Sequence, residues 1–156
     1  MTYDFLPNPD QVRAEFVKAH VTGEVGNKYM WELLREYAKQ ISFDDAVKKL
    51  RNIDGQIYFM SEAEGNPSFN NCALEEYEED KKGYAAYTDG EWLSEMLDYE
   101  WYNKGNMWED GFDLGSNDIL PDDVYAFDKS LSWFLVFTHE WDGDEPETRY
   151  CLAYNI

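Results

Sequence analysis

Residues 122–156 decide the fold, and they read DDVYAFDKSLSWFLVFTHEWDGDEPETRYCLAYNI. This stretch holds three runs of β-branched and aromatic residues, at 124–127, 133–138 and 150–154, and polar turns separate them. Runs of this length and composition, bounded by Asp, Ser, Gly and Pro, are typical of consecutive antiparallel strands. The middle run is the most apolar of the chain. We therefore expect it to lie centrally in a sheet and to be covered on both faces.

The length and composition of the chain indicate one globular domain. It has 156 residues, 44% of them hydrophobic and 17% aromatic, which suffices for one core and is too little for two. Acidic chains that stay disordered are poor in aromatics. The N-terminal residues lack the basic and apolar regions of a signal peptide, and no apolar run is as long as a membrane span. Two cysteines, Cys72 and Cys151, are expected to be reduced, and the protein to be cytoplasmic.

The negative charge is confined to one part of the chain. The net charge is -20; residues 1–51 hold eight acidic and eight basic residues, whereas residues 52–156 hold 25 acidic and five basic ones. Ordinary small domains carry a net charge of roughly 2–8 units. Self-repulsion of this size destabilises a compact state, so we expect a basic partner to compensate for it. Halophilic adaptation is the alternative, and the uneven distribution of the acid argues against it.

Three helices are predicted in the N-terminal part. Residues 8–10, Asn-Pro-Asp, are typical of a helix start and predict a short helix that ends near His20. The apolar spacing over residues 30–41 predicts a second, amphipathic helix. Ser42 opens a variant of the capping box and predicts a third helix, which Gly55 ends.

Further elements are predicted between this part and the C-terminal strands. Residues 56–61 and 83–87 have the composition of strands. Residues 88–91, Thr-Asp-Gly-Glu, form a capping box with Thr88 as the cap and predict a helix that ends at Gly105.

The predicted fold is α+β. We expect the N-terminal helices and one later helix to pack on one face of a mainly antiparallel sheet of four to six strands. Residues 1–156 would form a single domain, with a helical, charge-neutral part at 1–55 and a sheet-containing, strongly acidic part at 56–156.

The two histidines, His20 and His139, are the candidates for acid–base chemistry. They lie far apart in the sequence. Strand alternation places His139 on the face of Leu135 and Phe137, where a histidine hydrogen-bonded at a strand end is the common outcome. A small hydrolase that uses His139 with nearby carboxylates is the alternative.

No other motif indicates a reaction or a cofactor. Residues 142–145 lack the spacing of a calcium-binding EF-hand loop, and Cys151 in its apolar strand indicates a buried, inert thiol. Phosphate-binding loops, dinucleotide fingerprints, nucleophile elbows and CxxC pairs do not occur. The acid of residues 52–156 would repel phosphate, which argues against direct nucleic-acid binding. We expect no metal, no cofactor and no catalytic residue.

Acidic residues interleaved with aromatic ones are the remaining signal. Carboxylates steer the encounter with a cationic protein, while Trp and Tyr supply contact energy. The alternatives are a solvated acidic face for residues 75–82 and packing against the core for Trp108. We expect partner contacts from Glu75, Glu76, Tyr77, Glu78, Glu79, Asp80, Trp108, Glu109, Asp110, Trp141, Asp142, Asp144, Glu145 and Glu147.

The pattern Y-x-F-D-x-S-L-x-W-x-L-V-F-T-H-E…R-Y-C within residues 124–151 resembles segments of bacterial polymorphic-toxin immunity-type proteins. These are small acidic proteins encoded beside secreted toxins, which they neutralise by tight binding. The resemblance implies a non-enzymatic cytoplasmic inhibitor whose target is often a basic nuclease.

The function expected from the sequence is therefore binding without catalysis. The protein would neutralise a cationic protein partner, most specifically a toxin, and would bind neither nucleic acid nor a membrane. A nucleic-acid mimic of the phage anti-defence type, which inhibits a DNA- or RNA-binding complex, is the closest alternative. The hydrolase with His139 is a second, and a housekeeping domain whose acid only confers solubility is a third.

Overall fold

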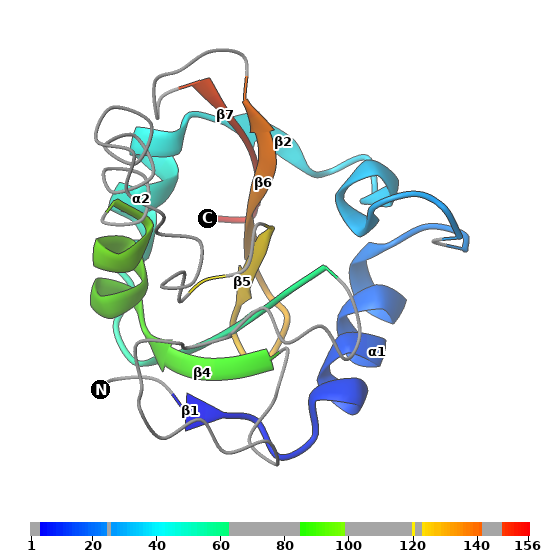
Figure 1. Ribbon diagram of the computed structural model, residues 1–156, viewed down its shortest axis with the longest axis horizontal. Coiled ribbons are helices and arrows are strands. Elements are labelled where there is room, and N and C mark those ends of the chain that lie inside the picture. The colour runs from blue at the N-terminus through cyan, green and yellow to red at the C-terminus, as the bar shows by residue number, and fades with distance from the viewer. Residues whose placement is uncertain (1–3, 25, 63–84, 99–119, 121–122, 142–147) are drawn as a thin grey trace, which may run out of the picture.

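The computed structural model describes residues 4–24, 26–62, 85–98, 120, 123–141 and 148–156 (Figure 1). The described strands form one antiparallel sheet with the order β1-β4-β3-β5-β6-β7-β2. A further helix spans residues 90–98, between β4 and β5. The elements are β1 (Asp4–Phe5), α1 (Pro9–His20), the 3₁₀ helix η1 (Met30–Leu33), β2 (Lys39–Ile41), α2 (Phe43–Arg51), β3 (Gln56–Met60), β4 (Ala85–Asp89), β5 (Val124–Phe127), β6 (Phe134–Trp141) and β7 (Arg149–Tyr154).

The α+β class is confirmed, and the three C-terminal strands form where the sequence places them. The described sheet has seven strands rather than four to six. The additional ones are β1 and β2, short strands that add to the two edges of the sheet. Both come from residues 1–55, so this part of the chain is not only helical.

The predicted helix over residues 30–41 is wrong. In place of the predicted helix, the chain forms only the short 3₁₀ helix η1, and Leu34 after it has an extended backbone. The chain then pairs with the sheet, because β2 lies antiparallel to β7 with Ile41 opposite Cys151. Ser42 caps α2 directly after β2. Because β2 occupies residues 39–41, a helix that starts at Met30 cannot extend to residue 41. Pairing with the sheet here overrides a local helical pattern.

Helix α1 covers one face of the sheet (Figure 1). Its Phe16 is fully buried, and its ring centroid lies 5.0 Å from that of Phe127, 5.7 Å from Tyr125 and 5.8 Å from Phe134. Phe127 and Phe134 pair across β5 and β6, so their side chains point to the same side. Full burial of one such phenylalanine contributes about 2–3 kcal/mol.

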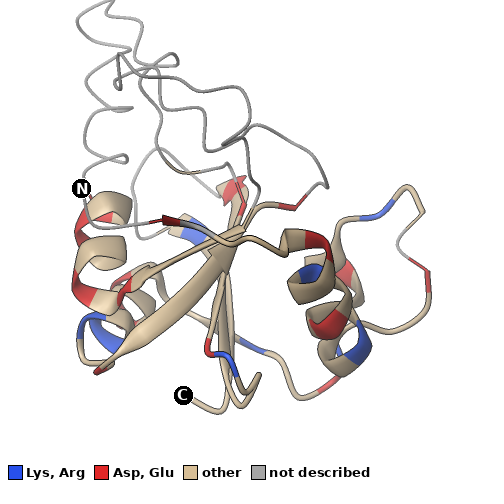
Figure 2. Cartoon of the chain, turned by 90° about the horizontal axis from the view of Figure 1, so that it is seen from below, with Lys and Arg blue, Asp and Glu red and all other residues tan. Residues whose placement is uncertain are grey.

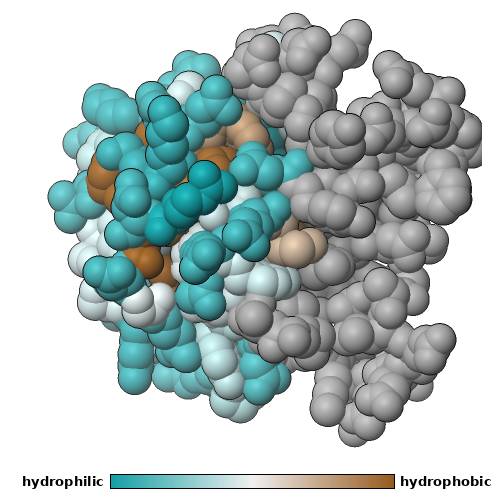
Figure 3. Space-filling model, turned by 90° about the vertical axis from the view of Figure 1, so that its left-hand side faces the viewer, coloured by the Kyte–Doolittle hydropathy of each residue, from teal (hydrophilic) through white to brown (hydrophobic). Residues whose placement is uncertain are grey.

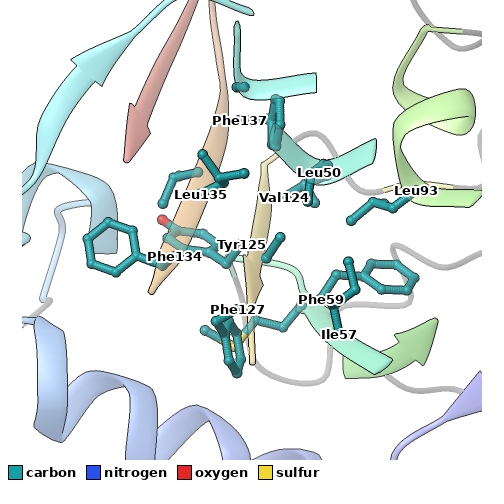
Figure 4. Packing of buried hydrophobic residues seen from close by; sticks show 14 of the residues in the cluster. Leu50, Ile57, Phe59, Leu93, Val124, Tyr125, Phe127, Phe134, Leu135 and Phe137 are labelled. Carbon is teal, nitrogen blue, oxygen red and sulfur yellow. The ribbon is translucent and has the colours of Figure 1, made fainter. Parts of the chain in front are cut away.

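Helix α2 and residues 90–98 cover the opposite face. Phe43 of α2 lies edge-on to Phe137 of β6, with ring centroids 6.0 Å apart, and Phe59 of β3 contacts Trp92. Figure 4 shows Tyr125 and Phe134 on one side of the central strands, and Val124 and Leu93 on the other. The prediction of helices on one face is therefore wrong. Strands β5 and β6 carry large apolar side chains on both sides, and both sides are covered by helices.

Side-chain caps start α2 and the helix of residues 90–98, whereas Asn8 before α1 makes no side-chain cap and Pro9 opens that helix. The hydroxyl of Ser42 accepts a hydrogen bond from the backbone N–H of Asp45 at 3.1 Å, as predicted. In the helix of residues 90–98 the cap is Asp89, whose carboxylate accepts from the N–H of Trp92 at 2.7 Å; Thr88 instead lies buried in β4. A Cβ atom at Gly90 would lie 2.0 Å from the carbonyl oxygen of Leu50, so glycine alone lets this helix begin against α2.

His20 at the end of α1 is a structural residue. It is 4% exposed and contacts the rings of Phe16, Phe134 and Tyr154. Its Nε2 lies 2.9 Å from the carbonyl oxygen of Leu131, which only accepts, so Nε2 carries the proton. Burial lowers the pKa of His20, and its hydrogen bond to Leu131 offsets part of that effect.

We expect the buried neutral form of His20 to make stability depend on pH. The unfolded chain takes up a proton near the ordinary histidine pKa of about 6.5, and the folded chain resists it. The free energy of unfolding should therefore fall as pH drops below this value, by at most about 1.4 kcal/mol per pH unit. Urea titrations at several pH values would measure it, and His20→Gln should lose this contribution while His139→Gln keeps it. Equal pH dependence in the wild type and His20→Gln would contradict the assignment.

Candidate functional site

Of the predicted partner contacts, Trp141 lies in the part of the chain that the structure describes. It ends β6, and the Arg149 side chain lies over its ring, with the guanidinium carbon 5.2 Å from the ring centroid. The remaining ones, and Cys72, lie outside the described residues: Glu75, Glu76, Tyr77, Glu78, Glu79, Asp80, Trp108, Glu109, Asp110, Asp142, Asp144, Glu145 and Glu147.

The chain enters and leaves these segments at one end of the sheet. Strand pairing places Met60 opposite both Ala85 and Tyr125, and Trp141 opposite Arg149. The end of β3, the starts of β4, β5 and β7, and the end of β6 therefore lie side by side. We call this the acidic end, because residues 63–84, 121–122 and 142–147 are joined to it. Residues 99–119 also lead back to it through Leu120.

The segments outside the described residues hold most of the net charge. They contain 16 acidic and three basic residues, whereas the described residues contain 17 acidic and ten basic ones. The described framework is mixed in sign, and Figure 2 shows α1 with both colours. Residues 63–84, 121–122 and 142–147, which join the acidic end, account for 11 of the 16 acidic residues and two of the three basic ones.

His139 lies at this end, where the strand pairing is irregular. The register shifts between Phe137 and Trp141. Asp123, which is 5% exposed and precedes β5, accepts a hydrogen bond from the backbone N–H of His139 at 2.7 Å and from its Nδ1 at 2.9 Å. A carboxylate thus satisfies a backbone donor at the irregularity and fixes the imidazole orientation.

The predicted orientation of His139 is wrong. Its ring lies 4.8 Å from that of Tyr29 and 6.3 Å from that of Trp31, on the side of the sheet where Tyr125 points. Phe137 points to the α2 side. The register shift breaks the strict alternation on which the prediction rested.

The turn that carries Tyr29 and Trp31 is fixed to the acidic end by side chains. The carboxylate of Glu62, just after β3, accepts from the N–H of Met30 and from the hydroxyl of Tyr125. The same hydroxyl accepts from the N–H of Trp31 at 3.0 Å. Within the turn, the Glu32 carboxylate accepts from the N–H of Tyr29 at 2.9 Å. Three consecutive backbone donors thus have defined acceptors.

Burial controls the protonation of this cluster. It raises the pKa of Glu62, while the hydrogen bonds from Tyr125 and Met30 lower it and the charge of Asp123 raises it. Burial, followed by the charge of Glu62, raises the pKa of Tyr125 well above its ordinary value. Tyr125 therefore stays protonated and its hydroxyl donates to Glu62.

Four rings form a partly exposed cluster over this turn, which we call the Tyr29 patch: Tyr29, Trp31, His139 and Tyr150. Tyr29 and Trp31 are stacked, with centroids 5.6 Å apart and planes 6° from parallel. Trp31 in turn contacts Tyr150 at 5.7 Å. Tyr29 is 41% exposed and is the only exposed large hydrophobic residue among those described. The patch offers aromatic surface where the acidic segments are anchored.

Among the described residues, the side of the molecule that α2 and residues 90–98 form has no large aromatic patch. Figure 3 shows the side formed by α2 and residues 90–98, where hydrophobic surface lies in separate small areas between hydrophilic side chains. Cys151 is fully buried in β7, and burial raises the pKa of its thiol to about 12, which makes it a poor nucleophile. Within the described ranges, no three His, Cys, Asp or Glu side chains are grouped to hold a metal ion.

Comparison with family models, with curated proteins and with solved structures finds no match to this chain. A search of the described helices finds none that is both long and apolar enough to cross a membrane. The geometry and charge of the acidic end therefore carry the functional proposal.

Sequence reasoning missed Tyr29, Trp31, Glu62 and Asp123. The apolar spacing of residues 30–41 assigned Met30 to a helix stripe, which concealed the turn. Nothing local marks Glu62 as an acceptor for residues 32 and 63 positions away. The one available signal was Asp123, an acid directly before a strand and opposite the end of the next one.

We expect Tyr125→Phe to destabilise the protein by about 1–3 kcal/mol, because it leaves the N–H of Trp31 and an oxygen of Glu62 without their partner. The matched control is Tyr58→Phe on β3, whose hydroxyl makes no hydrogen bond with a described residue; it should change stability little. Urea unfolding followed by far-UV circular dichroism would measure both. Equal effects of the two variants would show that the hydroxyl of Tyr125 does not fix the turn.

Proposed function

We propose that this protein is a non-enzymatic binding protein that neutralises a cationic protein partner. The observation that carries the proposal is the coincidence, at one end of the sheet, of the Tyr29 patch and the anchor points of the acidic segments. Most specifically, we propose an immunity protein that blocks a bacterial toxin, as the resemblance of residues 124–151 implies.

The charge distribution supports long-range attraction of a basic partner. Residues 63–84, 121–122 and 142–147, which join one end of the sheet, hold 11 acidic and two basic residues, an excess of nine negative charges, and ten basic residues are spread over the framework. Clustered charge of one sign raises association rates by roughly 10–1,000-fold. Such charge discriminates between partners more than it strengthens the final complex.

The aromatic residues support the contact itself. Interface energy concentrates in a few residues, with Trp, Tyr and Arg enriched among them. The Tyr29 patch holds two tyrosines and one tryptophan on a turn whose backbone is already ordered. Binding there would cost little conformational entropy.

We expect the protein to form a stoichiometric complex with the product of a neighbouring gene, and to abolish its toxicity on co-expression. Each neighbouring gene would be expressed alone and with this chain, and growth and complex size would be measured. Replacing Glu75, Glu76, Glu78 and Glu79 by Gln should slow association about tenfold or more. The same replacement of Glu15, Glu36, Asp44 and Glu95 changes the net charge equally but lies on the framework, and should slow it less.

Equal effects of the two charge variants would contradict the role of the anchored segments. A complex with a DNA- or RNA-binding assembly that duplex nucleic acid displaces would favour the mimic over the toxin inhibitor. If basic proteins bind this chain only weakly, without saturation, and not at physiological salt, the acidic residues have a solubilising role only.

One observation favours a second candidate, a hydrolase. Asp123 holds the Nδ1 proton of His139, as a carboxylate does in acid–base pairs, and the exposed Glu140 carboxylate lies 3.6 Å from Nε2. Nε2 would accept a proton from a water molecule that attacks the substrate. The same carboxylate of Asp123 also accepts a backbone N–H at the strand irregularity, which accounts for its position without catalysis.

For the hydrolase, we expect measurable turnover of an ester, phosphodiester or peptide substrate. His139→Gln should lower kcat by about 100-fold or more. Asp123→Asn tests the orientation of the ring, and Glu15→Gln on α1 serves as the unaffected control. Absence of turnover in the wild type, or wild-type rates in His139→Gln, would exclude this candidate.

A further inference from the structure

We propose that Tyr29 is the anchor of the interface and that it receives an arginine side chain of the cationic partner. This inference rests on the proposed function and specifies its partner: a protein that presents a guanidinium group rather than an ammonium group at the centre of its contact surface.

Hydrogen bonds hold the backbone of the turn that carries Tyr29. The N–H groups of Tyr29, Met30 and Trp31 donate to Glu32, Glu62 and Tyr125, respectively. Tyr125 belongs to β5, and Glu62 lies two residues after the end of β3. The hydrogen bonds that hold the backbone of the turn therefore do not involve the Tyr29 ring.

The Tyr29 ring is partly exposed, although its neighbours in the turn are packed. Tyr29 is 41% exposed although its neighbour Met30 is fully buried. Trp31 stacks against the ring, and His139 lies against it at a steep interplanar angle of 67°. The surroundings thus fix the ring's orientation and leave part of it accessible, as an aromatic anchor requires.

Two carboxylates lie near the Tyr29 ring. The Glu32 carboxylate lies on the same turn, and the Glu140 side chain, 57% exposed, is adjacent to His139. A cation at the Tyr29 ring would therefore have these two carboxylates nearby as well as a π-face beneath it.

An arginine side chain fits these aromatic and acidic surroundings better than a lysine side chain does. Guanidinium is planar and weakly hydrated, so it stacks on a ring while its edges donate to carboxylates; ammonium is compact and strongly hydrated. The same end of the sheet already holds a guanidinium over aromatic rings, with backbone carbonyl oxygens as its acceptors. Arg149 lies 5.2 Å from the Trp141 ring centroid and 5.9 Å from that of Phe137, and donates to the carbonyl oxygens of Thr138 and Phe137.

Titration with hexa-arginine and hexa-lysine peptides tests this inference without the natural partner. At low salt, the full chain should bind hexa-arginine about three- to fivefold more tightly than hexa-lysine, as an exposed cation–π contact allows. Tyr29→Ala should remove this preference, and Tyr29→Phe, which keeps the ring, should retain it. Lys28→Ala is the matched control on the same turn: it should strengthen both peptides alike and leave their ratio unchanged. Far-UV circular dichroism would check that each variant folds.

A ratio that is the same in the wild type and Tyr29→Ala would overturn the inference. Salt-sensitive binding of both peptides without any preference for arginine would also overturn it, while leaving the acidic binding protein of the proposed function intact. Failure of either peptide to bind at low salt would overturn both.

Discussion

The structure depends on a central pair of strands that is apolar on both faces. Tyr125 and Phe134 point to one side of β5 and β6, and Val124 and Phe137 to the other, and all four are fully buried (Figure 4). Exposure of either face would forfeit about 2 kcal/mol for each large side chain. Cover on both sides is therefore obligatory. Helix α1 supplies it on one side, and α2 with residues 90–98 supplies it on the other.

This arrangement also places the candidate site. The chain leaves α1 at Val21 and comes back to it at Leu34, which pairs with Val21, before it enters β2. The turn of residues 29–33 lies within this excursion, and the buried pair of Glu62 and Tyr125 holds it at the acidic end. The aromatic surface there thus depends on these side-chain hydrogen bonds. Residues 63–84 and 142–147 join the same end of the sheet, because β3 pairs antiparallel with β4 and β6 with β7.

The sequence was sufficient for those parts of the fold that local chemistry determines. The three C-terminal strands, the helix starts at Pro9 and Phe43 and the α+β class follow from composition, periodicity and caps. It was insufficient where distant partners compete. Residues 39–41 pair with β7 more than 100 residues later, and no local signal reports a partner so remote.

The candidate site shows the same division. The uneven distribution of charge along the chain can be predicted from the sequence, because it requires only a count of acidic and basic residues. The Tyr29 patch cannot, since it joins a turn near the N-terminus to His139 across 110 positions. The orientation of His139 depends on a register shift that alternation cannot anticipate. Local patterns therefore indicate the kind of partner, and tertiary structure indicates where it would bind.

The central claim is that the negative potential is concentrated at the end of the sheet that carries Tyr29. The most direct measurement is paramagnetic relaxation enhancement of each backbone amide by a cationic nitroxide, compared with a neutral nitroxide of the same size. The account predicts a marked excess of the cationic probe near residues 29–33 and 139–141, relative to residues 54–55 and 128–132 at the opposite end. An equal ratio of the two probes at both ends would contradict it.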